Sequence, residues 1–425
     1  SQIDQKFQEI YGIIDYNEEG IPQNNPTRIQ NHSTTVGILV DKYQAGGTIE
    51  DLQKAIKIAD YLISRQDPQT GAYQGPSGDY TSVIYPAKSI MELMEVEAEM
   101  IAAGNDEEDW QDCQYESVKK AMDNLVELHG DLHTEGQLTF EDGAFSCSAT
   151  QLSQFALLHP EGSAEREKYQ ASALEYLNKH QALEQEIIPD SRMNGGSLRF
   201  WEAQYDVLLT ADPNNMMNSP HGWTAWNIYG LFNMYQLTGD PYYLEKGMNA
   251  MGSCVQLMGF DGNLNWAFIA DPYIEGSLFV QIENDSSLYG QGTRKDVTLG
   301  ESYVDMISDW WKAPPDTNVG GYYGQGGACD NDVHEIFKAM EETVLTKAYV
   351  VEQQDGSIEA YNCTAEKDSN GILNIVTNEE ELIDQISLNL QEETTYQVTF
   401  TESGKTVSGT AKSGMQWITS DSVPA

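Results

Sequence analysis

The chain has 425 residues, of which 40% are hydrophobic and 10% aromatic, so it can bury one large core and leave room for a small second domain. Its 67 acidic and 23 basic residues give a formal net charge of −44, which repels a phosphate backbone and argues against nucleic acid as a partner. No run of about 18 or more apolar residues occurs, so we expect no membrane span.

One unit recurs along the chain: a loop rich in Gly and aromatic residues, an aromatic-faced helix, a short break and a charged amphipathic helix. In chain order we expect its copies at 32–43 with 49–65, at 81–103 with a helix ending near 128, at 148–158 with 164–185, and at 219–237 with 241–257. Thr48 with Glu50 and Asp51 supports the helix start at 49, because hydroxyl caps and early acids favour a helix N-terminus. Such pairs bury their apolar stripes against their neighbours, which predicts about five hairpins in a solenoid or toroid.

Beyond about residue 345 the sequence changes to short, β-branched and often alternating segments. They occur at 348–352, 358–361, 372–376, 386–390, 396–400 and 406–410. Turn signals at Asp355-Gly356, Asn370-Gly371 and Ser403-Gly404 separate several of them. We therefore expect a helical domain at 1–345 and a small antiparallel β module at 346–425.

The sequence gives little support for a metal or a cofactor. The five cysteines lack zinc-ligand spacing. The pairs Gly195-Gly196 and Gly326-Gly327 follow no predicted strand and lack the lysine of a phosphate-binding loop. Asp330-Asn331-Asp332 offers oxygen ligands of the kind calcium prefers, without the full calcium-loop pattern. We expect no cofactor, with calcium at 330–332 as the open alternative.

Candidate functional residues come from the loops before the aromatic helices, since rigid helices hold such loops on one face. The first loop offers Asn31 and His32, the second Asp79, Tyr80, Tyr85 and Lys88, and the third Arg192, Asn194, Arg199 and Trp201. The fourth offers His221, Trp223, Trp226 and Asn227, Trp266 stands in the loop after it, and the last offers Tyr322 and His334.

These residue types suit a saccharide ligand. In so acidic a chain, the loop arginines Arg192, Arg199 and Arg294 are candidate carboxylate clamps, because the planar guanidinium fits a carboxylate bidentately. Trp and Tyr beside Gly can stack on sugar faces. Each arginine fits a structural ion pair equally well, and His221 fits a packing or capping role at a helix start.

The repeat, the loop Asp261-Gly262-Asn263-Leu264-Asn265-Trp266 and the trailing β module together resemble the (α/α) toroid enzymes of polysaccharide degradation. These include uronate-specific polysaccharide lyases and the related unsaturated-glucuronyl and glucuronidase hydrolases. The resemblance covers about residues 30–345 in architecture, plus the β module that many of the lyases carry. It implies a mainly α fold with an incomplete or six-hairpin barrel and a polysaccharide or oligosaccharide substrate. A secreted, periplasmic or cell-surface enzyme of bacterial type is expected, and the start at Ser1 fits either a removed signal peptide or a trimmed chain.

A lyase of this kind would work by β-elimination next to a uronate carboxylate. That chemistry needs a group that neutralises the carboxylate, a base for the C5 proton and an acid for the leaving oxygen. We assign Arg192, Arg199 and Asn194 to the carboxylate, His221 to the base, and Tyr80 or Tyr322 to the acid. His334 is a further catalytic candidate, and Trp201, Trp223 and Trp266 are expected to bind the sugar rings.

Two alternatives stay open. A glycoside hydrolase would use a carboxylate pair, for which Asp79, Glu202, Asp261 and Asp330 are the available loop acids. A glycan-binding protein without turnover would keep the aromatic loops but would need no residue with a shifted pKa. The joint presence of His, Arg, Tyr and Asn in several loops ranks the binding protein behind the two enzymes.

Overall fold

The computed structural model of the chain describes residues 16–23, 29–73, 80–102, 109–130, 142–181, 184, 195–196, 218–221, 224–255, 265–270, 301–305, 336, 338–379 and 382–421. Within these ranges the backbone alone is described at 29–31, 34, 80–85, 99–102, 109–112, 142–144, 218–221, 265–270 and 301–305. The chain divides into two compact units. Unit 1 comprises Ser1–Gly230 with Gly247–Ile336, and unit 2 comprises Leu231–Lys246 with Phe337–Ala425. The predicted domain boundary at 345 stays a prediction.

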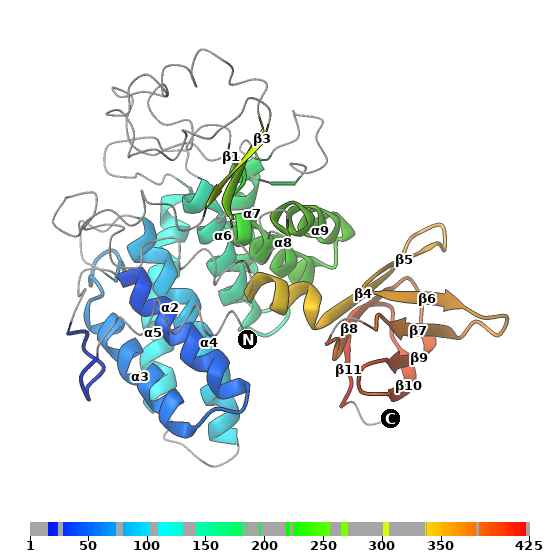
Figure 1. Cartoon of the computed structure of the whole chain (residues 1–425), viewed down its shortest axis with the longest axis horizontal. Helices are drawn as coiled ribbons and strands as arrows, with labels where there is room; N and C mark the ends of the chain where they lie inside the picture. The colour runs from blue at the N-terminus through cyan, green and yellow to red at the C-terminus, as the bar shows by residue number, and fades with distance from the viewer. Residues whose placement is uncertain are drawn as a thin grey trace. The chain divides into compact units, whose positions relative to one another are not determined.

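The helices follow one another as hairpins from the N-terminus, from blue α2 to green α9 in Figure 1. They are α2 (Ile29–Gln44) with α3 (Ile49–Ser64), α4 (Tyr80–Ala102) with α5 (Asp109–Leu128), α6 (Asp142–Leu157) with α7 (Ala164–His180), and α8 (Thr224–Thr238) with α9 (Pro241–Val255). The start of α3 is confirmed, since Thr48 and Asp51 form a capping box there.

In unit 1 the helices form two layers. Helix α2 packs on α4 and α4 on α6, while α3, α5 and α7 each pack against the preceding helix of their hairpin. Helix α3 shows why, because Leu52, Ala55, Ile56, Ala59 and Leu62 give it one buried apolar face. This double layer confirms the predicted mainly α fold of (α/α) toroid type.

Two inner helices begin earlier than predicted. Helix α2 starts at Ile29, so His32 lies inside the helix, and α6 starts at Asp142, where residue 148 was predicted. The cause is the polarity of the buried residues, since Ser146 and Ser148 are buried although they resemble a polar loop. An apolar periodicity cannot identify a helix whose interior face carries hydroxyl groups.

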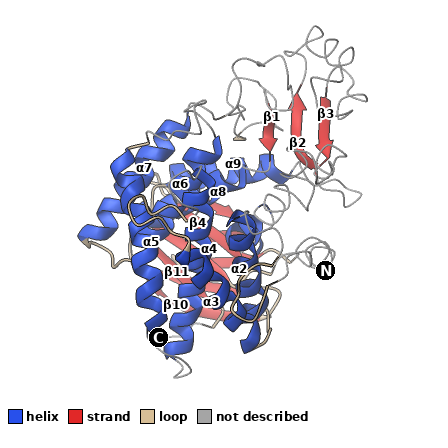
Figure 2. Cartoon of the chain, turned by 90° about the vertical axis from the view of Figure 1, so that its left-hand side faces the viewer, coloured by secondary structure: helices blue, strands red, loops and turns tan. Residues whose placement is uncertain are grey.

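A three-stranded antiparallel sheet replaces two predicted loops of unit 1. Its strands, seen side by side in Figure 2, are β1 (Asn218–His221), β2 (Asn265–Ala270) and β3 (Glu301–Asp305), in the order β1-β2-β3. His221 therefore lies in β1 and Trp266 in β2, and both were wrongly predicted to lie in loops. Pro220 fits an edge strand, which can lack an amide donor. The three strands are far apart in the sequence, so no turn sequence predicts their pairing.

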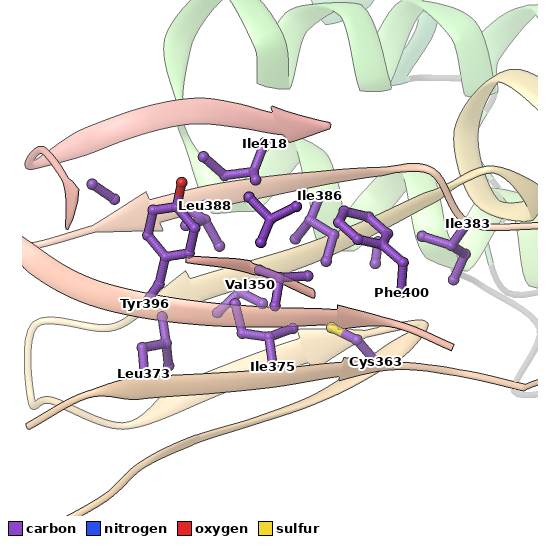
Figure 3. Close-up of a cluster of buried hydrophobic side chains, with 14 of the residues drawn as sticks. Val350, Cys363, Leu373, Ile375, Ile383, Ile386, Leu388, Tyr396, Phe400 and Ile418 are labelled. Carbon is purple, nitrogen blue, oxygen red and sulfur yellow. The ribbon is translucent and has the colours of Figure 1, made fainter. Parts of the chain in front are cut away.

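Unit 2 contains the β module. Its strands are β4 (Lys347–Glu352), β5 (Ile358–Tyr361), β6 (Cys363–Lys367), β7 (Leu373–Thr377), β8 (Gln385–Leu390), β9 (Thr394–Phe400), β10 (Lys405–Ala411) and β11 (Gly414–Thr419), with the π-helix η2 (Glu341–Leu345) before them. They form two four-stranded sheets, ordered β10-β9-β7-β6 and β11-β8-β4-β5. Side chains of both sheets share one buried core, which includes Val350, Leu388, Ile375 and Phe400 (Figure 3).

The prediction of an antiparallel module is wrong in one respect. Both sheets are mixed, because β4 pairs with β8 and β7 pairs with β9 in parallel. The hairpins at Gly356, Gly371 and Gly404 are confirmed, and each of these glycines has a positive φ, of 83°, 78° and 66°. Parallel partners are joined by crossovers, which have no short turn sequence.

Candidate functional site

The structure leaves most of the predicted site residues outside the described parts of the chain. This holds for Arg192, Asn194, Arg199, Trp201, Trp223, Tyr322 and His334, and for the loop acids Asp79, Glu202, Asp261 and Asp330. Tyr80 is the first residue of α4, and only the backbone is described for Tyr80, His221 and Trp266. Their chemical roles stay predictions.

The pairing of β1 with β2 brings two of these candidates together along the backbone. His221 pairs with Ala267, the residue after Trp266. The positions of the predicted base and of one predicted sugar-binding aromatic are thus adjacent in one sheet, although 45 sequence positions separate them.

The described residues contain a second concentration of polar groups, which we call the inner polar cluster. It consists of buried polar residues in the first halves or middle turns of α2, α4, α6 and α8. Its members are His32, Ser33, Thr35, Lys88, Ser89, Glu92, Ser146, Ser148, Thr150, Gln151, Ser153, Thr224 and Asn227. Later turns of the same helices bury mainly apolar residues, among them Val40, Val96, Phe155 and Phe232.

These helices share a direction. Each hairpin turns the chain back, so the first helices of successive hairpins run parallel when they pack side by side. The polar turns of α2, α4 and α6 therefore lie toward one end of unit 1. Helix α8 joins them because Thr150 Oγ1 of α6 donates a hydrogen bond of 2.6 Å to the carbonyl oxygen of Trp226.

The cluster includes a buried ion pair within α4. Lys88 Nζ donates to Glu92 Oε1 one helical turn later, and both side chains are almost completely buried. The Lys88 ammonium also lies 4.4 Å from the ring centroid of Tyr229 in α8. Buried ion pairs rarely stabilise a protein more than apolar residues of the same size. Their presence therefore points to a use beyond folding.

On α2, His32 has aromatic neighbours. The distance between the Tyr16 hydroxyl and His32 Nδ1 is 2.8 Å, and the Tyr61 ring packs edge-on at 5.9 Å between centroids. Burial raises the pKa of Tyr16 well above its ordinary value. The Tyr16 hydroxyl therefore keeps its proton at neutral pH and can donate a hydrogen bond to the imidazole.

Sequence analysis singled out some of this cluster and missed the rest. Lys88, Asn227 and His32 were candidates, grouped with the loops before their helices although they lie within the predicted copies at 81–103, 219–237 and 32–43. Trp226 was also a candidate, and its carbonyl accepts the hydrogen bond from Thr150. Gln151 was missed. The available indication was the polar run 146–154 inside a helix that otherwise carries Phe, Leu and Ala.

The cluster offers hydroxyl and amide groups, one imidazole, one ammonium and one carboxylate. It suits a ligand that forms many uncharged hydrogen bonds. In the described ranges, no group of three or more His, Cys, Asp or Glu side chains is arranged to hold a metal ion. The calcium candidate at 330–332 lies outside those ranges. None of the described helices has the length and apolar character needed to cross a membrane.

No protein-family model matches this sequence, and no curated protein matches it either. Among solved structures, the chain is similar to a GH76 α-mannanase of Bacteroides thetaiotaomicron, with 14% identity, a TM-score of 0.42 and 79% of each chain covered. It is similar to a cellobiose 2-epimerase of Bacillus thermoamylovorans, with 10% identity, a TM-score of 0.42, and 74% of this chain and 71% of the epimerase covered.

A polysaccharide lyase is also similar, with 15% identity, a TM-score of 0.38 and 60% of this chain covered. This chain spans 43% of the length of that lyase, and 62% of the length of a D-mannose isomerase that is similar at 10% identity. At 10–15% identity, none of these proteins assigns a role to a residue of this chain.

Proposed function

We propose that this chain is a carbohydrate-active enzyme whose glycan lies over the polar turns of α2, α4, α6 and α8. The inner polar cluster is the observation that carries the proposal. Hydroxyl, amide and charged side chains of these four helices gather in the cluster, and such groups can exchange hydrogen bonds with a polar ligand. A sugar is densely covered with hydroxyl groups that donate and accept hydrogen bonds.

Among carbohydrate reactions, we propose β-elimination on a uronic-acid glycan. Arg192, Arg199 and Asn194 would neutralise the uronate carboxylate, and His221 would remove the C5 proton. Electrons of the broken C5–H bond form the new double bond to C4 as the C4–O bond breaks, and Tyr80 or Tyr322 would protonate the leaving oxygen. His334 is held as an alternative catalytic group, and Trp201, Trp223 and Trp266 as sugar-binding aromatics.

Two features support this assignment. The backbones of His221 and Trp266 occupy neighbouring strands, so the residues proposed as base and as stacking aromatic belong to one sheet. The few arginines of a chain with a net charge of −44 also suit recognition of a carboxylate, because elsewhere the acidic surface repels it.

The test is a panel of uronic-acid and neutral polysaccharides, followed both by near-ultraviolet absorbance and by reducing ends. A lyase gives both signals, because each cleavage creates a new reducing end on one fragment and an unsaturated sugar on the other. Reducing ends without absorbance would replace the lyase by a hydrolase with a carboxylate pair. Binding without either signal would identify a non-catalytic glycan-binding protein.

His221→Ala tests the proposed base on the glycan that the panel selects. We expect the unsaturated product to form at least about a hundredfold more slowly, since general-base catalysis contributes about that much or more. His129→Ala is the matched control, because the His129 side chain is 71% exposed and should leave the rate unchanged. An unchanged rate in His221→Ala would remove His221 from the mechanism.

A further inference from the structure

Two buried amide side chains lie next to the contact between α6 and α8. Thr150 and Trp226 make that contact through the hydrogen bond from Thr150 Oγ1 to the Trp226 carbonyl. Gln151 follows Thr150 and is 0% exposed, and Asn227 follows Trp226 and is 1% exposed. Each amide is thus held in the interior of unit 1 by the helix that carries it.

Most of the hydrogen-bonding capacity of these amides is not used by the rest of the described structure. Within the described ranges, Gln151 Oε1, Gln151 Nε2 and Asn227 Oδ1 have no hydrogen-bond partner. An unused buried donor or acceptor destabilises the folded state, and native proteins contain few of them. Met or Leu would fill similar volumes without this cost. Folding alone therefore does not explain why the two positions carry amides.

We propose that Gln151 and Asn227 form a subsite that binds uncharged hydroxyl groups of the glycan. An amide oxygen accepts a hydrogen bond from one hydroxyl, and its NH2 group donates to a neighbouring hydroxyl. The identity of the ligand rests on the proposed function. The subsite adds that the glycan is held on α6 and α8 through hydroxyls, apart from any group that binds a carboxylate.

If the two amides form this subsite, replacing either of them should raise the stability of the free protein and weaken its binding of the glycan. Gln151→Met removes the unused amide, so the free protein should gain about 2 °C in Tm. The same change should weaken binding of the panel glycan at least about tenfold, as measured by calorimetry, because hydrogen bonds to the sugar are lost. Asn227→Leu should act in the same direction and provides an independent test from the other helix.

Gln114→Met is the matched control. Gln114 is similarly buried, in α5, and its Oε1 also lacks a partner within the described ranges, but its Nε2 donates a hydrogen bond of 3.1 Å to Glu97 Oε1. Its replacement leaves the Glu97 carboxylate without that donor, so Tm should fall while glycan binding stays unchanged.

Two results would overturn the subsite. If Gln151→Met and Asn227→Leu lower Tm as Gln114→Met does, the amides are structural and hold a buried water or a protein group. If both variants bind the panel glycan with wild-type affinity, the subsite alone is wrong and the proposed function stands. If the wild-type chain binds no glycan of the panel, the proposed function fails and the subsite fails with it.

Discussion

Lys88 and Glu92 of α4 form an ion pair in the protein interior. Lys88→Met leaves the Glu92 carboxylate buried without its ammonium, and we expect a loss of about 3 kcal/mol or more in the free energy of unfolding. Combining Lys88→Met with Glu92→Leu should restore most of this loss, because neither charge of the pair then remains. Urea denaturation of the single and the double variant measures the difference. Equal stability of the single variant and the wild type would show that the pair is not coupled.

Asp123 on α5 gives a prediction about how stability depends on pH. Burial raises the pKa of its carboxyl, but hydrogen bonds from Lys119, Lys168 and Tyr169 outweigh burial and hold the pKa below its ordinary value. A lowered folded-state pKa stabilises the protein above the unfolded-state pKa of about 3.9, and the stabilisation is lost as the pH falls through the folded-state value.

Asp123→Asn should therefore lower Tm clearly at pH 7 and by a smaller amount at pH 3. Thermal unfolding of both proteins at the two pH values measures this. A Tm difference that is the same at pH 3 and pH 7 would contradict the ionised network.

Gly71, in the turn between α3 and α4, combines a positive φ with close packing on another helix. Its φ is +75°, and a Cβ there would lie 2.8 Å from the Ala121 Cα of α5. Gly162 has a similar φ of +77° but nothing within 4 Å of the corresponding position. Comparing alanine substitutions at the two glycines therefore separates the effect of backbone strain from the effect of close packing between α5 and the turn.

We expect Gly162→Ala to cost about 1 kcal/mol of unfolding free energy from strain alone. Gly71→Ala should cost about 3 kcal/mol, because the crowding of α5 adds to the same strain. Chemical denaturation gives both values. Equal losses would mean that α5 moves away without cost.

The hairpins show how far sequence reasoning reaches at the level of helices and strands. The start of α3 follows from Thr48 and the acids after it, and the β-hairpins follow from Gly356, Gly371 and Gly404, because caps and tight turns are local. The sheet of β1, β2 and β3 and the parallel pairs of the β module depend on distant partners, so no window of sequence contains them.

In the candidate site, too, residues beside local sequence signals were predicted and those that depend on distant packing were not. Lys88 and Asn227 were found because they stand near Gly-rich and aromatic segments. Gln151 was missed because a polar residue in a helix is normally solvent-exposed, and its burial comes from tertiary packing that the neighbouring sequence does not show. The sequence predicted the kinds of residue in the site and most of the helices that carry them. Which of those residues face the interior depends on how the helices pack, and the sequence does not show this.

For the molecule as a whole, the net charge of −44 gives a prediction about salt. Like charges repel one another in the folded state, and salt screens the repulsion. Raising NaCl from about 10 mM to about 500 mM should raise Tm at pH 7. At a pH near the sequence pI of 4.2 the same change should have little effect, because acids are then partly protonated. A Tm independent of salt at pH 7 would show that the acidic groups are too dispersed to oppose folding.

The proposed function depends on the glycan lying over the polar turns of α2, α4, α6 and α8. The most direct measurement is a crystal structure of His221→Ala with an oligosaccharide of the glycan that the panel selects. We predict sugar hydroxyls within hydrogen-bond distance of Gln151 and Asn227. An oligosaccharide bound instead to the sheets of the β module, with both amides still lacking a partner, would contradict the proposed site.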